Sequence, residues 1–174
     1  MSLTEDDLFY ARVVAAFVDS GRTATPDASA RTLDVASDLP GGRVLAVVRP
    51  AARSVTLYAV WPTIVPADAV PAVTELVVRA NADLFVSALE LDLARATVAA
   101  RTAVALGELD PPDDALGHLL VTALAEAEDA MTTYTPALDA VLTGAPAAQA
   151  AADAQRSALD GFGARSTPAS EPPR

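Results

Sequence analysis

The first place to look for catalytic chemistry is His118, the only histidine of the chain. With one histidine, no cysteine and no lysine, the sequence excludes a site of two histidines on a metal, a thiol nucleophile, Schiff-base chemistry and a lysine-dependent phosphate loop. His118 follows Gly117 in a stretch with helical periodicity, and no G-x-S-x-G motif supplies a nucleophile for it. We therefore interpret His118 as a surface or half-buried structural residue.

Carboxylates offer a second kind of chemistry, and three of them cluster ahead of a predicted helix, namely Asp110, Asp113 and Asp114. Carboxylate oxygens suit Ca²⁺ or Mg²⁺, but this spacing fits no EF-hand, and Pro111-Pro112 stiffens the loop. Capping of the helix by Asp113 explains the cluster more simply. Glu126 and Asp129 are chemically able to act as acid and base, although exposed helix positions are the simpler interpretation. A carboxylate and metal enzyme stays an alternative, but we expect no catalytic residue, no metal and no cofactor.

The net charge of −11 is unevenly distributed along the chain. All basic residues are arginines, and between Arg101 and Arg156 the sequence holds nine acids and no cationic side chain apart from His118. An acidic face repels phosphate backbones, so we expect no direct nucleic-acid binding, whereas it attracts a basic protein surface. Solubility of an alanine-rich chain is the competing explanation. The candidate partner-binding residues are Asp110, Asp113, Asp114, Glu126, Glu128 and Asp129.

Length and composition indicate one domain with a core of small side chains. The chain has 174 residues, of which 52% are hydrophobic and only 5% aromatic. Its first residues show no basic segment followed by an apolar run, and no apolar stretch approaches the roughly 18 residues of a membrane span. We therefore expect a cytoplasmic protein that does not enter a membrane.

Hydrophobic periodicity predicts a first helix over 5–19, capped by Thr4, and three strands over 31–37, 44–48 and 54–61 that form an antiparallel meander. The apolar stripe of the first helix consists of Leu8, Ala11, Val14, Ala15 and Val18. Trp61 lies at the end of the third strand, where it is interpreted either as an exposed anchor for a partner or as a core residue.

Asp68 is predicted to cap a second helix that ends near Asn81. Its apolar residues either pack on the sheet or face the same helix of a second copy, and they are the candidate dimer interface: Val73, Leu76, Val77 and Ala80. Two further strands over 86–93 and 96–106 and a long helix from Asp113 to Gly144, kinked at Pro136, complete the predicted fold. A short helix is predicted within 145–160, and 161–174 is predicted to be disordered.

Four segments follow one another along the chain: 58–62 (Tyr-Ala-Val-Trp-Pro) with 65–66 (Val-Pro), the second helix closing on an asparagine at 75–81, the strand 89–92 (Leu-Glu-Leu-Asp), and 134–138 (Tyr-Thr-Pro-Ala-Leu) with Val141 and Gly144. These segments, in this order of elements, resemble YbjN-like proteins. The chain departs from the family at 93–96, where Leu-Ala-Arg-Ala replaces an Asp-Gly type of turn, and beyond Gly144. The register of that hairpin is therefore open.

The resemblance implies a type III secretion chaperone-like fold over 4–144, which is an α+β domain with an antiparallel five-stranded sheet packed against helices. It also implies a homodimer, and a non-enzymatic adaptor or chaperone-like regulator of other proteins. Together with the charge, this predicts a specific, basic protein partner, for instance a nucleic-acid-binding protein in a stress response. A regulatory domain that senses a small ligand between sheet and helices is the alternative.

Overall fold

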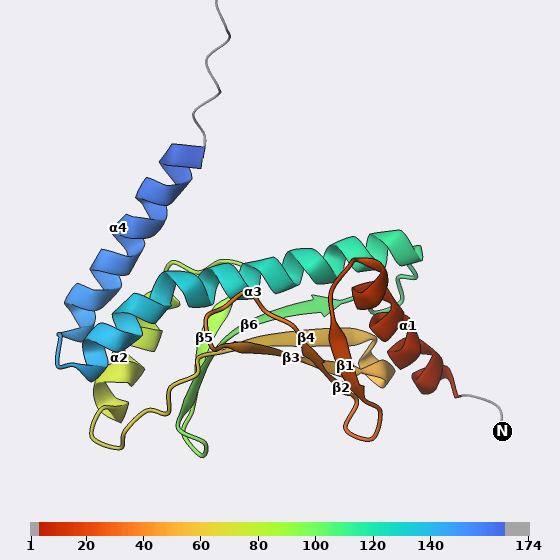
Figure 1. Ribbon diagram of the computed structural model, residues 1–174, viewed down its shortest axis with the longest axis horizontal. Coiled ribbons are helices and arrows are strands. Elements are labelled where there is room, and N and C mark those ends of the chain that lie inside the picture. Colours follow the sequence, from red (N-terminus) through yellow and green to blue (C-terminus); the bar gives the residue numbers. More distant parts are fainter. Residues whose placement is uncertain (1–3, 166–174) are drawn as a thin grey trace, which may run out of the picture.

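Figure 1 shows the computed structural model, which describes residues 4–165. The described chain is α+β, as predicted, but its antiparallel sheet has six strands instead of five. The elements are α1 (Glu5–Asp19), β1 (Ala24–Asp27), β2 (Thr32–Val35), β3 (Arg43–Arg49), a 3₁₀ turn (Pro50–Ala52), β4 (Ser54–Val60), α2 (Val70–Ala80), β5 (Ala88–Asp92), β6 (Thr97–Ala105), α3 (Asp113–Leu142) and α4 (Ala147–Arg165).

The sheet has the strand order β1-β2-β3-β4-β6-β5, and every neighbouring pair is antiparallel. The long helix α3 lies along one face of it, with α1 beside its beginning and α2 and α4 beside its end (Figure 1). Alternate strand residues turn to the helices and are buried, such as Val44, Leu57 and Ala100, because side chains in a strand alternate between the two faces. This layer of apolar side chains is the core.

The strand missed in the sequence is β1, at one edge of the sheet. Thr25-Pro26-Asp27 is typical of a turn, and Pro26 argues against a central strand. Ala36 donates its N–H to Thr23 O at 2.8 Å. In the segment 23–27, the backbone N–H and C=O groups of the odd-numbered residues therefore point to β2. Pro26 therefore turns outward, where its missing N–H costs no hydrogen bond and removes a donor from the sheet edge.

At the opposite edge, one side chain occupies the outward backbone groups of a β5 residue. Asn81, which follows α2, donates Nδ2 to Leu89 O at 2.9 Å and accepts from Leu89 N at 2.8 Å on Oδ1. These two backbone groups point away from β6, so a further strand would use the same pair. The amide of Asn81 satisfies both, and β5 is closed to additional pairing at this residue.

The β5–β6 hairpin settles the register that the sequence left open. Asp92 pairs with Thr97, so residues 93–96 form a four-residue turn. Asp92 Oδ1 accepts from the backbone N–H groups of Ala94 at 2.9 Å and Arg95 at 3.0 Å, and Ala96 adopts a φ of 53°. The aspartate thus supplies the turn chemistry that an Asp-Gly pair would otherwise provide.

Helix α1 has the predicted bounds, but the face that it buries is not the predicted one. Thr4 forms a capping box with Asp7, as the capping prediction requires. The predicted apolar stripe is wrong, because Leu8 and Val18 are each 55% exposed. The buried residues are Phe9, Tyr10, Val13, Ala16 and Phe17. Both faces are apolar, and the face with the larger aromatic area packs on the core.

Helix α2 places its whole apolar stripe inside the same chain. Its four buried residues, predicted as a dimer interface or as core, pack toward α3, α4 and β5 and are Val73, Leu76, Val77 and Ala80. Core packing is therefore their role in this structure. Asp68 does not cap the helix, whose N-cap position is Ala69. Trp61 is also a core residue, with 2% of its surface exposed.

Of the last two helices, α3 lies within its predicted bounds and α4 extends further than predicted. Helix α3 continues through Pro136 and begins directly at Asp113, so Pro112 and not Asp113 is at the N-cap. Helix α4 is longer than the predicted short helix and packs alanines against α2 and α3, namely Ala147, Ala150, Ala151 and Ala154. Residues 161–165 belong to α4, contrary to the predicted disorder, and 166–174 lie outside the described residues. None of the described helices combines the length and apolar composition that a membrane crossing requires.

Candidate functional site

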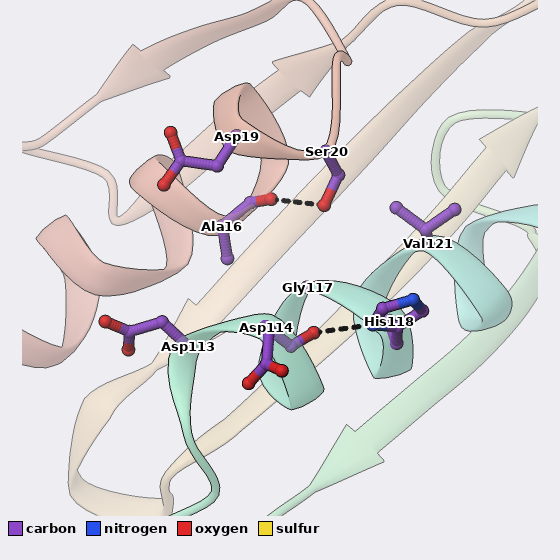
Figure 2. Close-up of a pocket in the computed structure, with 8 residues that line it drawn as sticks. All are labelled: Ala16, Asp19, Ser20, Asp113, Asp114, Gly117, His118 and Val121. Carbon is purple, nitrogen blue, oxygen red and sulfur yellow. Dashed lines mark hydrogen bonds between the residues drawn. The ribbon is translucent and has the colours of Figure 1, made fainter.

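A cleft between the end of α1 and the start of α3 contains His118. It has a volume of about 480 Å³ and is lined by Ala16, Asp19, Ser20, Asp113, Asp114, Gly117, His118 and Val121. His118 Nδ1 donates to Asp114 O at 2.8 Å, and Ser20 Oγ donates to Ala16 O at 2.7 Å. Figure 2 shows that the carboxylates in the cleft point away from the imidazole ring. Hence the hydroxyl, the imidazole and the carboxylates do not converge on one reacting position.

Two of the predicted acids hold α1 to the loop before α3. Arg12 contacts Asp113 Oδ1 through Nε at 2.5 Å and Asp110 Oδ1 through Nη1 at 2.6 Å, and it donates Nη2 to Pro111 O. Arg53 adds a second guanidinium to Asp110 Oδ1 at 2.8 Å. These contacts, that from Arg53 first, lower the pKa of Asp110. The charges of Asp110 and Asp113 are therefore already compensated within the chain.

The other predicted acids lie on two flanks of α3. Glu128 Oε1 accepts from Ser37 Oγ at 2.7 Å, so this half-buried carboxylate fastens α3 to the segment between β2 and β3. Glu126 and Asp129 are exposed on the opposite flank. Residues two positions apart in a helix point in nearly opposite directions, which separates Glu126 from Glu128. The structure therefore does not gather the six predicted residues into one surface, and Asp114 stays exposed at the start of α3.

Glu126 and Asp129 belong to a groove that we call the acidic groove. It has a volume of about 470 Å³ between the α2–β5 loop, α3 and α4, and it is lined by Asp83, Leu84, Phe85, Ser87, Glu126, Asp129, Ala130, Thr133, Tyr134, Gln155, Ala158 and Leu159. Phe85 is 97% exposed and Leu159 is 73% exposed. Among residues 4–159, no arginine forms an ion pair with Asp83, Glu126 or Asp129.

The wall of the acidic groove joins three elements. Gln155 of α4 donates Nε2 to Asp83 Oδ2 in the α2–β5 loop. Tyr134 of α3 is buried beneath them, and its burial raises the pKa of the phenol, with the Asp83 carboxylate raising it further. The groove thus combines a fixed wall with an exposed aromatic side chain and three carboxylates on its rim. Such an arrangement suits contact with another surface better than it suits bond chemistry.

Neither Phe85 nor Asp83 was identified from the sequence. The available signal was an aromatic residue in the short connection 82–85, between a predicted helix and a predicted strand, where large apolar side chains are uncommon. Among the side chains that the structure describes, there is also no group of three or more histidine, aspartate or glutamate residues arranged to hold a metal ion.

Comparison of the chain with protein-family models, curated proteins and solved structures found no match. The resemblance to YbjN-like proteins therefore rests on the order and spacing of the sequence segments alone. The function has to be argued from the acidic groove itself.

Proposed function

We propose that this protein is a non-enzymatic adaptor or chaperone-like regulator that binds a basic protein partner in the acidic groove. The observation that carries the proposal is Phe85, which stands fully exposed beside Asp83, Glu126 and Asp129. Solvent exposure of a phenylalanine is costly, and an aromatic side chain seated in a partner's pocket is a common centre of binding energy.

The charge around Phe85 indicates the kind of partner surface that the groove favours. Three carboxylates at the groove, with which no arginine among residues 4–159 forms an ion pair, favour cationic side chains around an apolar pocket. The net charge of −11 also favours a positively charged partner, because a strongly acidic protein meets a basic one faster at low ionic strength. Nucleic-acid-binding proteins are one class with such surfaces.

The test is a pull-down from bacterial lysate with the purified protein, eluted by a salt gradient and read by mass spectrometry. We expect one or a few specific basic proteins that elute with rising salt. Phe85→Ala should weaken their retention about tenfold, and Glu126→Gln with Asp129→Asn should shift elution to lower salt.

Matched controls separate the groove from general acidity. Asp6→Asn with Glu108→Gln removes the same charge from exposed positions outside the groove, and Ile64→Ala removes an exposed apolar side chain elsewhere. Both controls should leave retention within about twofold. Equal losses from control and groove variants, or an empty bead at low salt, would refute binding by the acidic groove.

A further inference from the structure

Strand β6 is longer than its neighbour β5. On one side, β6 pairs with β4 as far as Ala105, opposite Ser54. On the other side, its pairing with β5 stops at Arg101, opposite Ala88. The last residues of β6 therefore run on past the start of β5, as Figure 1 shows. The sheet has a step at this point, with one side of β6 left without a neighbouring strand.

The backbone groups at this step are those of Ala103 and Ala105. Trp61 N donates to Val98 O at 2.9 Å and Leu106 N donates to Arg53 O at 3.0 Å. The backbone N–H and C=O groups of the even-numbered residues of β6 therefore point to β4. The backbone N–H and C=O groups of the odd-numbered residues consequently point to the β5 side. Within the described chain, no element pairs with the N–H and C=O groups of Ala103 and Ala105 on that side, and both residues are exposed. They form an open strand edge of two hydrogen-bonding residues.

A hollow lies beside this edge and meets the acidic groove. Its volume is about 350 Å³, and it is lined by Val86, Thr102, Ala103, His118, Leu119, Thr122, Ala123 and Glu126. Thr102 is only 3% exposed, and its Oγ1 has no hydrogen-bond partner among the described residues. Buried hydroxyl groups are normally satisfied, and this one, on a residue that lines the hollow, is left without a partner. Glu126 lines both the hollow and the acidic groove.

We propose that an extended segment of the protein partner adds to the sheet along β6, in line with β5. Its backbone pairs with the N–H and C=O groups of Ala103 and Ala105, which is β-augmentation of an open edge. Alternate side chains then enter the hollow beside Thr102, where a small apolar or hydroxyl side chain fits. A cationic residue of the same segment reaches Glu126, and the chain continues toward Phe85. This inference rests on the proposed function and names the conformation of the bound segment.

Amide exchange in the wild-type protein tests the pairing directly. The probe is a capped octapeptide that alternates arginine and valine, added to about 1 mM at low salt. We expect NMR-detected exchange of the Ala103 and Ala105 amides to slow by about tenfold or more, while that of Thr102 and Val104, already paired with β4, changes little. Peptide binding without protection of Ala103 and Ala105, or no binding at this concentration, overturns the proposal.

A proline variant tests the same edge from the protein's side. Ala103→Pro removes an N–H that the described sheet does not use, and proline is tolerated where the amide faces outward. It should weaken octapeptide binding by between about threefold and about tenfold. Ala103→Thr keeps the N–H and should bind within about twofold of wild type. Equal affinity of the folded proline and threonine variants overturns the proposal, and if the proline variant does not fold, the exchange measurement decides.

The two proposals fail in different ways. If lysate proteins are retained through Phe85, Glu126 and Asp129 but the captured partner leaves the exchange of Ala103 and Ala105 unchanged, strand addition is wrong and the acidic groove stands. If the groove variants retain the partner as wild type does, the proposed function itself is wrong.

Discussion

The two ends of α3 use acidic side chains in opposite ways. At the start, Asp110 and Asp113 are joined to α1 and to the loop before β4 by Arg12 and Arg53. Farther along the helix, the acidic groove presents carboxylates with which no arginine among residues 4–159 forms an ion pair, around an exposed Phe85. Thus the same residue type is paired within the chain at one end and is left without such a cation at the other, where we propose that a partner binds.

The difference shows that local acid density is a poor guide to a binding site. Asp110, Asp113 and Asp114 are the denser cluster in sequence, yet two of the three are compensated within the chain. What distinguishes the groove is the absence of a paired arginine, together with an apolar anchor. The following variants test whether the two ends separate stability from binding as this comparison requires.

The largest effect on stability is expected from Arg12→Ala. The variant removes hydrogen bonds to two carboxylates and to Pro111 O, and leaves the carboxylates without this cation. We expect the free energy of unfolding to fall by about 1–2 kcal/mol in urea titrations, with partner retention unchanged. Arg156→Ala, which removes an exposed ion pair within α4, is the control and should stay within about 0.5 kcal/mol of wild type. A loss of partner retention in Arg12→Ala would contradict the separation of the two ends.

Two double variants, each of which replaces two carboxylates by amides, sharpen the comparison. Asp110→Asn with Asp113→Asn should lower the urea midpoint, because the arginines lose their anions, and should leave retention intact. Glu126→Gln with Asp129→Asn should change the free energy of unfolding by less than about 0.5 kcal/mol while retention weakens. Both quantities are measured on the same protein preparations. If both double variants lose retention equally, the partner responds to net charge and not to the groove.

The smallest effect is a dependence of stability on acidic pH at the α1 end. The hydrogen bond from Arg31, followed by those from Thr4, lowers the pKa of Asp7 to about 2. A carboxyl group whose folded pKa lies below its unfolded value of about 4 contributes stability above pH 4, and this contribution is lost as the pH falls toward 2. We expect the urea midpoint to fall over this range in wild type and to fall less in Asp7→Asn and Arg31→Ala. An unchanged slope in both variants would show that Asp7 does not contribute.

Sequence patterns predicted the elements whose signals agree with one another. Thr4 and the acids after it indicated the start of α1, and the β-branched run before Trp61 indicated β4. The buried face of α1 was wrong because Leu8 and Val18 on one side and Phe9 and Phe17 on the other both repeat with helical spacing. Periodicity alone does not choose between two apolar faces. The strand β1 was missed because its proline is tolerated only at an edge, and strand order is a tertiary property.

The candidate site was predicted only in part, for a similar reason. Glu126 and Asp129 were identified from their charge, but Glu128 was grouped with them although it lies on the other flank of α3. The pairing of Asp110 with Arg12 joins residues 98 positions apart, which spacing along the chain does not reveal. The exposure of Phe85 depends on how the α2–β5 loop lies against α3 and α4, which is a tertiary property.

Asn81 and Pro26 each restrict pairing at one edge of this sheet. A filament of sheets requires two open edges in each molecule, one to receive a strand and one to offer. Here Pro26 withholds a donor at β1, and Asn81 occupies the outward groups of β5 at Leu89. The step at Ala103 and Ala105 is a further opening at the β5 side, where the outward backbone groups of Leu91 also have no backbone partner among the described residues. Strand addition at the step, as proposed above, would fill this opening, while Pro26 and Asn81 oppose the edge-to-edge pairing through which copies of the protein would grow into a polymer.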